Sequence, residues 1–358
     1  MKNIRNNNLS KAGGRALLLL SFFALMAAHA CQVPVFRYAL ERWEPAPYLL
    51  RITPGAGGLT ADERTLLESL QNPAEPANLE IEIAPPADKP ALRLHYPHTP
   101  RDAARQPIWQ TDLTKENAFG VIDSPLRREL RQRLLTGQTA VWVLLASGDS
   151  AKDEEAVRTL VESMKAAQEK LKLPGGVITQ EEAGQFSSPK LHENADVLQS
   201  DLPLRIEFSL LRLSRRNLEE AALIHMLTHL EPDLDSYAKE PMAFPVFGRG
   251  RALEPLIGRG IHPDNIMEVS SYLCGACSCE IKDQNPGIDL LLAANWDPVD
   301  NAPKIETVRI EPAAPSPIAA TTPEAGRSIW KSIVLVLALV LAAGFLSRKA
   351  AAPPARDL

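Results

Sequence analysis

Three cysteines stand close together in the run C-G-A-C-S-C, as Cys274, Cys277 and Cys279. Two thiols separated by two residues can close a small disulfide ring, and a thiolate with a lowered pKa attacks a partner's disulfide, so Cys274 and Cys277 fit a redox dithiol. Three thiolates at this spacing can also surround Cu(I) or Zn(II), with a fourth ligand from Cys31 or a histidine. The third interpretation is structural: Cys31 is joined to one member of the cluster, and a second pair forms inside it. The sequence leaves all three interpretations open.

The first cysteine of the chain, Cys31, follows a leader of the kind that directs export. Residues 1–15 are basic and polar, residues 16–28 are apolar, and A-H-A precedes Cys31. The apolar run is short for a membrane helix but suits a signal peptide with a small-x-small cleavage site, so we predict that residues 1–30 are removed. The position of Cys31 also resembles the lipobox of bacterial lipoproteins, which implies a lipid on its thiol. Ala28 stands where that motif usually has leucine, and the alternative is plain cleavage with Cys31 left as a thiol or disulfide partner.

A second apolar run, Ser328–Ser347, is long enough to span a membrane as one helix. The proline-rich residues 297–327 before it predict a semi-extended tether, and residues 348–358 after it form a short tail. Export of the N-terminal side places this tail in the cytoplasm, and the flanking bases agree mildly with the positive-inside rule. We therefore predict a single-pass protein of the cell membrane. Its main domain is extracytoplasmic, on the periplasmic side, and its expected partners are the membrane and another envelope protein.

The charge of the exported part argues against a nucleic-acid partner. The whole chain has a formal net charge of −5, and residues 1–30 hold bases but no acid, so removing them makes the remainder more acidic. No basic field is left to replace the counterions on phosphates.

The other polar motifs are less specific. His225 and His229 share one face of a predicted helix, but the H-E-x-x-H general base is missing, so we interpret them as partly exposed histidines. The run G-R-G-R at residues 248–251 fits no phosphate-binding loop and predicts a tight hairpin. No hydrolase, kinase or dehydrogenase motif appears, so a thiol-disulfide oxidoreductase is the one enzyme class that the sequence suggests.

The elements that must position these residues alternate between strands and helices. Apolar periodicity predicts strands at residues 48–52, 79–83, 140–146, 204–210 and 288–293. Helices are predicted at residues 35–43, from Ser124-Pro125 onward, after Ser150, from Asn217 to about Leu230, and from His262 to the cysteines. On the helix after Ser150, the expected buried face holds Val157, Leu160, Val161, Met164 and Leu171. This alternation predicts an α/β sheet covered by helices.

The order of elements from Val141 to Gly260 resembles the thioredoxin-like superfamily, in which a strand leads into a long helix and a later cis-proline precedes the final hairpin. The resemblance implies a thioredoxin-like domain at residues 121–296, with Pro245 as that proline, and a second, degenerate lobe at residues 31–120. S-G-D-S at residues 147–150 stands where the family keeps its dithiol, so the usual site is redox-silent. C-G-A-C resembles the C-G-P-C of thioredoxins but follows the proline instead of preceding it.

Two further stretches, CQVPVFRYALERW and CGACSCEIKDQNPGIDLL, resemble parts of bacterial envelope proteins, and this resemblance brings no activity with it. The main hypothesis is therefore thiol-disulfide or soft-metal handling through Cys274, Cys277 and Cys279, with Pro245 beside them and copper or zinc as the candidate metal. The alternative is a non-catalytic interaction module, an accessory subunit of an envelope membrane complex such as a transporter.

Overall fold

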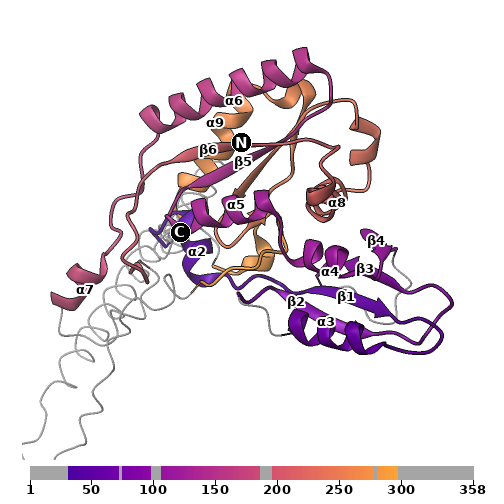
Figure 1. The fold of residues 1–358 in the computed structure, drawn as a ribbon. Coiled ribbons are helices and arrows are strands. Elements are labelled where there is room, and N and C mark those ends of the chain that lie inside the picture. Colours follow the sequence, from indigo (N-terminus) through magenta and orange to yellow (C-terminus); the bar gives the residue numbers. More distant parts are fainter. Residues whose placement is uncertain (1–30, 72–74, 98–105, 186–195, 278–279, 297–358) are drawn as a thin grey trace, which may run out of the picture. The chain divides into compact units, whose positions relative to one another are not determined.

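The computed structural model describes residues 31–71, 75–97, 106–185, 196–277 and 280–296. The predicted leader, tether, membrane run, tail and Cys279 lie outside these ranges. All described residues belong to one compact unit, which ends at Glu306. In this part of the chain, no helix combines the length and apolar character needed to cross a membrane. The predicted mixture of sheets and helices is confirmed (Figure 1).

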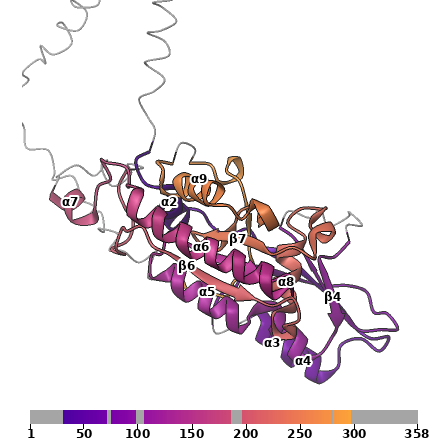
Figure 2. The same cartoon turned by 90° about the horizontal axis from the view of Figure 1, so that it is seen from above.

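The first sheet has the strand order β2-β1-β3-β4. Its strands are β1 (Tyr48–Thr53), β2 (Leu79–Ile83), β3 (Ala91–His95) and β4 (Trp109–Asp112). Strand β1 is parallel to β2 and antiparallel to β3, which is antiparallel to β4. Helix α3 (Ala61–Gln71) connects β1 to β2, and helix α4 (Lys115–Ile122) follows β4. These two helices lie next to each other in Figure 2.

The second sheet has the order β10-β8-β7-β5-β6, and β9 also pairs with β7. Its strands are β5 (Ala140–Leu145), β6 (Phe208–Leu213), β7 (Met242–Phe247), β8 (Arg251–Ala252), β9 (Leu256–Ile257) and β10 (Ile288–Asp289). Strand β5 is parallel to β6 and antiparallel to β7, which is antiparallel to β8. Helix α6 (Ser150–Lys170) connects β5 to β6, and α9 (Pro263–Cys274) follows the antiparallel strands.

The two sheets therefore repeat one arrangement. In each, a first strand is parallel to a second and antiparallel to a third, which pairs with a fourth, and a helix joins the first strand to the second. The two sheets differ in the connection between the second strand and the third. In the second sheet this connection, from β6 to β7, contains helix α8 (Ala221–Thr228), whereas in the first sheet the connection from β2 to β3, residues 84–90, contains no helix.

The second sheet is buried on both faces, which explains why β5 reads as the uninterrupted apolar run AVWVLL. Alternate residues of β5 enter two different cores. One core contains Val141, Val143 and Leu145 with residues of α5 (Pro125–Leu135) and α8. The other contains Trp142 and Leu144 with residues of α6, α9 and α2 (Val35–Arg42). Figure 1 shows α6 and α9 on one side of the sheet and α5 and α8 on the other.

The first of these cores also includes the apolar face of the N-terminal sheet, so the two sheets share buried contacts. Asn78 connects them by hydrogen bonds. Its side-chain nitrogen donates to the carbonyls of Ala46 and Leu290, 2.9 and 3.2 Å away, and its oxygen accepts from the amide of Leu292 at 3.0 Å. The predicted strand at residues 288–293 is a strand only at Ile288–Asp289, because Leu290 and Leu292 bond to Asn78 and Ala293 forms only an isolated bridge, with Ala77.

Two further predictions need correction. The strand predicted at residues 204–210 begins at Phe208, because its partner β5 begins at Ala140, which pairs with Phe208 and leaves the earlier residues without a partner strand. Val161 was expected in the buried face of α6 but is 50% exposed. The buried stripe of this helix runs through Ala156, Leu160, Met164 and Ala167. Val161 follows Leu160 in the sequence, so its side chain lies to one side of this stripe.

Candidate functional site

The two stretches that carry the cysteines lie side by side. Pro34, just before α2, forms an isolated antiparallel bridge with Ala276, just after α9. The amide of Val35 donates to the carbonyl of Gly275, and the amide of Cys277 donates to the carbonyl of Val33, both at 3.0 Å. The segment that begins with Cys31 is therefore held against the end of α9.

Further bonds continue this contact along both stretches. The indole nitrogen of Trp43 donates to the carbonyl of Glu280 at 2.9 Å, and the ammonium of Lys282 donates to the carbonyl of Glu44 at 2.6 Å. The carboxylate of Asp289 accepts from the amide of Ala46 at 2.8 Å. Residues 33–46 are thus bonded at several points to described residues between 275 and 289.

Cys274 is the last residue of α9 and is buried. Burial raises the pKa of its thiol to about 12. The carboxyl end of a helix carries partial negative charge, which also disfavours a thiolate. At neutral pH this sulfur is therefore protonated and a poor nucleophile.

Cys31 and Cys277 are buried in the same core as Cys274. Burial also raises the pKa of the Cys31 thiol, and the carboxylates of Asp196 and Glu280 add to the effect. Burial is the main cause of the raised pKa of Tyr38, followed by the charge of Glu280, and the nearby Cys31 and Cys277 raise it further. The structure thus brings three of the predicted cysteines together in one apolar region.

The fourth cysteine, Cys279, lies outside the described residues. Within the described ranges, no group of three or more histidine, cysteine or acidic side chains is placed to hold a metal ion. Metal binding by Cys274, Cys277 and Cys279 therefore stays a prediction.

Pro245 differs from the expectation in two ways. It lies within β7, paired with Trp142 of β5, and so within the hairpin of β7 and β8 instead of before it, and the described residues contain no cis peptide bond. Its carbonyl accepts from the amide of Leu253 at 3.0 Å, on the side of β7 away from β5. The missing N–H of proline points to that same side, so β7 tolerates Pro245 without loss of a bond to β5.

The loop after β5, where the thioredoxin-like resemblance puts the redox site, is filled by carboxylate contacts. Asp153 accepts from the amide of Ser147 at 2.7 Å and from that of Gly148 at 3.1 Å. Asp149 is the N-cap of α6 and accepts from the amide of Ala151 at 3.0 Å. Carboxylates thus occupy the amides that would stabilise an anion at the start of this helix.

The predicted histidine pair lies at the end of α8, where His225 is in the last turn and His229 is the C-cap residue, with ring centroids 5.4 Å apart. Burial, and secondarily the neighbouring His229, lowers the pKa of His225. The bond from the ring of His229 goes to the backbone carbonyl of His225, so the pair stays within its own helix.

The predicted hairpin at residues 248–251 is confirmed as the turn between β7 and β8. Gly248 and Gly250 adopt positive φ values of 58° and 96°, which favour glycine. Arg249 donates to the carbonyl of Leu40 at the end of α2, and Arg251 donates to the carbonyl of Asn285, both at 2.8 Å. The two arginines hold the cysteine-bearing stretches in place.

Two buried polar clusters were not predicted from the sequence. Arg37 and Glu41 of α2 pair at 2.8 Å with fully buried side chains, and both bond to Ser200. The carboxylate of Glu220 accepts from Ser124 and from the amide of Leu126 at the start of α5. Their sequence signal was an R-x-x-x-E spacing in one helix and a capping-box glutamate, neither of which indicates burial.

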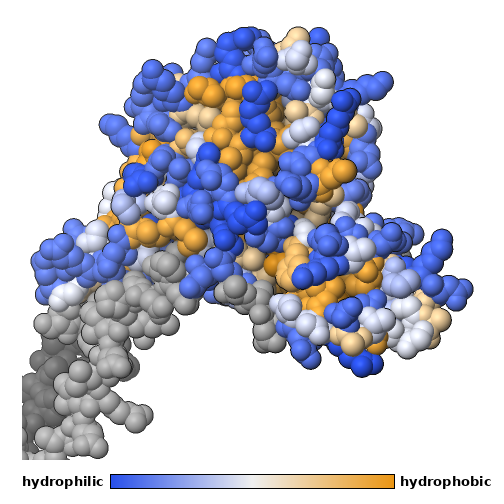
Figure 3. Space-filling model, viewed as in Figure 1, coloured by the Kyte–Doolittle hydropathy of each residue, from blue (hydrophilic) through white to orange (hydrophobic). Residues whose placement is uncertain are grey.

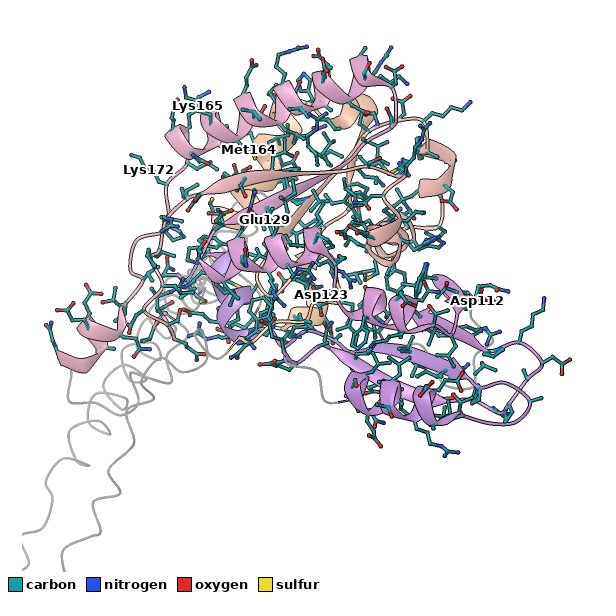
Figure 4. All side chains as sticks on the ribbon, in the orientation of Figure 1. Asp112, Asp123, Glu129, Met164, Lys165 and Lys172 are labelled. Atoms are coloured by element: carbon teal, nitrogen blue, oxygen red, sulfur yellow. The ribbon has the colours of Figure 1, made fainter. Side chains whose placement is uncertain are left out.

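Two hollows in the surface could receive a ligand. One, of about 600 Å³, is lined by acidic residues that include Glu231, Asp233 and Glu254. The other, of about 1180 Å³, lies among β4, α4, the start of α5 and the start of α8. Asp123, between α4 and α5 in Figure 4, belongs to its lining.

Comparisons with protein-family models, with curated proteins and with solved structures find no match to this chain.

Proposed function

We propose that the chain is a membrane-tethered extracytoplasmic protein whose two thioredoxin-like lobes act through protein contacts, as an accessory subunit of an envelope membrane complex. The repeated strand order supports the thioredoxin-like assignment. Each sheet contains a first strand, a connecting helix and a parallel second strand, followed by antiparallel strands, as the resemblance implies.

The observation that carries a non-catalytic role is the position of Cys274. A thiol that attacks disulfides is usually exposed and has a lowered pKa, for example at a helix N-terminus. Cys274 has the opposite surroundings: it is buried, it ends α9, and its pKa is raised to about 12. The start of α6 offers no substitute, because Ser147 and Ser150 stand there and Asp153 occupies the nearby amides.

An assay of disulfide reduction tests this proposal. We expect the full chain in detergent to reduce a fluorogenic glutathione disulfide, with dithiothreitol as electron donor, no faster than its Cys274→Ser and Cys277→Ser variants do. Catalytic turnover that either substitution abolishes would instead establish an oxidoreductase.

Thiol-disulfide or soft-metal handling is the second candidate, because Cys31, Cys274 and Cys277 share one apolar core. Metal analysis of protein purified without chelators separates the two functions. Stoichiometric copper or zinc that is lost in Cys277→Ser would favour this second candidate, whereas metal-free protein favours the interaction module.

The topology is part of the same proposal. The apolar run at residues 328–347 anchors the chain, and the residues before it face the periplasm. We expect added protease to digest the main domain in intact spheroplasts. Digestion only after the inner membrane is ruptured would reverse the orientation.

A further inference from the structure

The larger hollow, among β4, α4, α5 and α8, has exposed apolar side chains in its lining. Phe119 of α4 is 42% exposed, and Leu218 of the short helix η2 (Leu218–Glu220) is 87% exposed. Both line the hollow, together with Trp109 of β4. Large apolar side chains that gather at one hollow in the surface are typical of a site where a partner binds.

The size of the hollow favours a protein segment over a small molecule. Its volume of about 1180 Å³ exceeds the roughly 300–1,000 Å³ that is typical of small-molecule pockets. Its lining extends from Ser69 in α3 to Ala293, after β10. A segment with several side chains fills such a space, whereas a small ligand leaves much of it empty.

The net charge of the lining is negative. Its charged residues are the acids Glu75, Glu116, Asp123 and Glu219 and the bases Arg128 and Arg131. Each base is paired with an acid of the same lining, Arg128 with Asp123 at 2.7 Å and Arg131 with Glu75. Glu116 and Glu219 are exposed and form no ion pair within the described ranges. Four acids less two bases thus leave two negative charges for a partner to neutralise.

The start of α5 also disfavours an acidic occupant. Ser124 and Pro125 belong to the lining, and the free amides at a helix N-terminus usually attract anions. Here the carboxylate of Glu220 already accepts from the amide of Leu126 at 2.6 Å and from the hydroxyl of Ser124. The charge that complements this hollow is therefore positive.

We propose that this hollow binds a segment of a partner protein in which large apolar side chains lie beside lysine or arginine. The apolar side chains pack on Phe119, Leu218 and Trp109, and the bases pair with Glu116 and Glu219. Burial of the apolar contacts supplies affinity, whereas the charges select the partner. This inference deepens the proposed function and rests on it in one respect, namely that the chain acts through protein contacts.

Photocrosslinking to a synthetic probe tests the position and the charge of this surface. The full chain in detergent, with p-benzoylphenylalanine in place of Leu218, is irradiated together with a short biotinylated peptide of leucine and lysine. We expect a crosslink to this peptide. A second peptide, with glutamate in place of every lysine, should give about tenfold less product, because like charges then face each other.

Two charge reversals separate this hollow from the general acidity of the surface. Glu116→Lys combined with Glu219→Lys should lower the yield of the lysine peptide about tenfold. The matched control combines Glu231→Lys with Glu254→Lys, in the lining of the other hollow, and should leave the yield within about twofold. Equal losses in the two variants, or equal crosslinking of the two peptides, would overturn the inference.

The same photoreactive residue at position 218 identifies the natural partner in cells that express the full chain. We expect a crosslinked partner peptide with apolar and basic residues, sequenced by mass spectrometry, and its loss in the variant with Glu116→Lys and Glu219→Lys. The positional control is Val161, which is 50% exposed on α6, across the second sheet from α8. A crosslink only to a second copy, to a peptide without bases, or equally from position 161 contradicts the proposal. Those results would leave the non-catalytic role itself untouched, because the disulfide-reduction assay measures it separately.

Discussion

Glu220, the N-cap residue of α8, contacts the start of α5 through its buried carboxylate. It accepts from Ser124 and from the amide of Leu126, and the guanidinium of Arg127, also buried, lies within electrostatic reach. Burial lowers the pKa of Arg127 to about 10, which leaves it charged at neutral pH. The nearby carboxylate therefore compensates a charge that has no access to water.

Removal of this carboxylate should be costly. We expect Glu220→Ala to lower the free energy of unfolding by about 3–5 kcal/mol, because an uncompensated charge stays buried. Urea denaturation measures the change. The neighbouring Glu219→Ala, at an exposed position, should stay within about 0.5 kcal/mol of the wild type. Equal losses in the two variants would show that the buried contacts of Glu220 contribute little.

His95 at the end of β3 is buried, and neither ring nitrogen has a hydrogen-bond partner in the described residues. Burial, followed by the charges of Arg51 and Arg93, lowers its pKa below the usual 6.5. As the pH falls below 6.5, the unfolded chain binds a proton that the folded chain resists, so the stability contributed by neutral His95 is lost in that range.

The corresponding test compares melting temperatures at about pH 7.5 and pH 5. We expect His95→Leu to lose less stability on acidification than the wild type. The control is His262→Asn, whose side chain is 58% exposed in the wild type and which keeps an N-cap for α9. Identical acid sensitivity in wild type and His95→Leu would contradict the assignment.

At the scale of elements, the turn between β7 and β8 has little room for change. A Cβ atom at Gly250 would lie 2.5 Å from Cδ1 of Leu292, and the φ of 96° is unfavourable for other residues. Gly250→Ala should therefore destabilise the protein by about 1–3 kcal/mol in urea denaturation. Gly57→Ala, where no atom lies within 4 Å of the added Cβ, serves as control. The prediction is wrong if both variants unfold at the same urea concentration.

Elements with strong local signals could be predicted from the sequence. The proline after Ser124 and the H-P-D after Ile261 marked the first turns of α5 and α9, and the apolar run from Ala140 marked a strand buried on both faces. The start of β6 could not be found in the same way. The alternation of Leu204 and Ile206 continues before Phe208, but pairing begins where β5 begins, and that depends on tertiary contacts.

The candidate site was predicted in part. Clustered cysteines in the sequence indicated a site, and Cys31, Cys274 and Cys277 do share one core. The burial of these cysteines, which decides their reactivity, could not be predicted from the sequence, because cysteine is common both in exposed reactive sites and in apolar cores. Asn78 carried no distinctive signal, and the capping-box position of Glu220 did not reveal its partner Ser124, since the partners of both residues lie far away in the chain.

At the scale of the whole molecule, the two sheets should unfold together. They share an apolar core, and Asn78 bonds to both the segment before β1 and the segment after β10. We expect one calorimetric transition for residues 31–296 and, in Asn78→Ala, a loss of about 1–3 kcal/mol in the free energy of unfolding. Hydrogen exchange should then accelerate in β1 and β5 alike. Faster exchange in β1 alone, or two separate transitions, would mean that the sheets fold independently.

Figure 3 shows an apolar area on the face between α6 and α5, where β6 forms the edge of the second sheet. Side chains cover the free backbone groups of this edge. The carbonyl of Leu210 accepts from Arg133 at 3.1 Å, and the amide of Phe208 donates to Gln168 at 2.9 Å. Such contacts oppose the addition of a further strand at this edge, so a partner is not expected to bind there by strand pairing.

The contact between the first and last described stretches has a consequence for biogenesis. The bond from Trp43 to Glu280 joins residues that are 237 positions apart in the sequence, and the bond from Ala46 to Asp289 spans 243 positions. In the proposed topology, the chain would cross the membrane with its N-terminus first, so the residues after Cys31 would wait until nearly all of residues 31–296 had emerged before they met their partners. Loops this long close slowly, and the apolar residues of α2 would stay uncovered meanwhile. Under that proposal, folding should follow translocation and benefit from a chaperone on the far side.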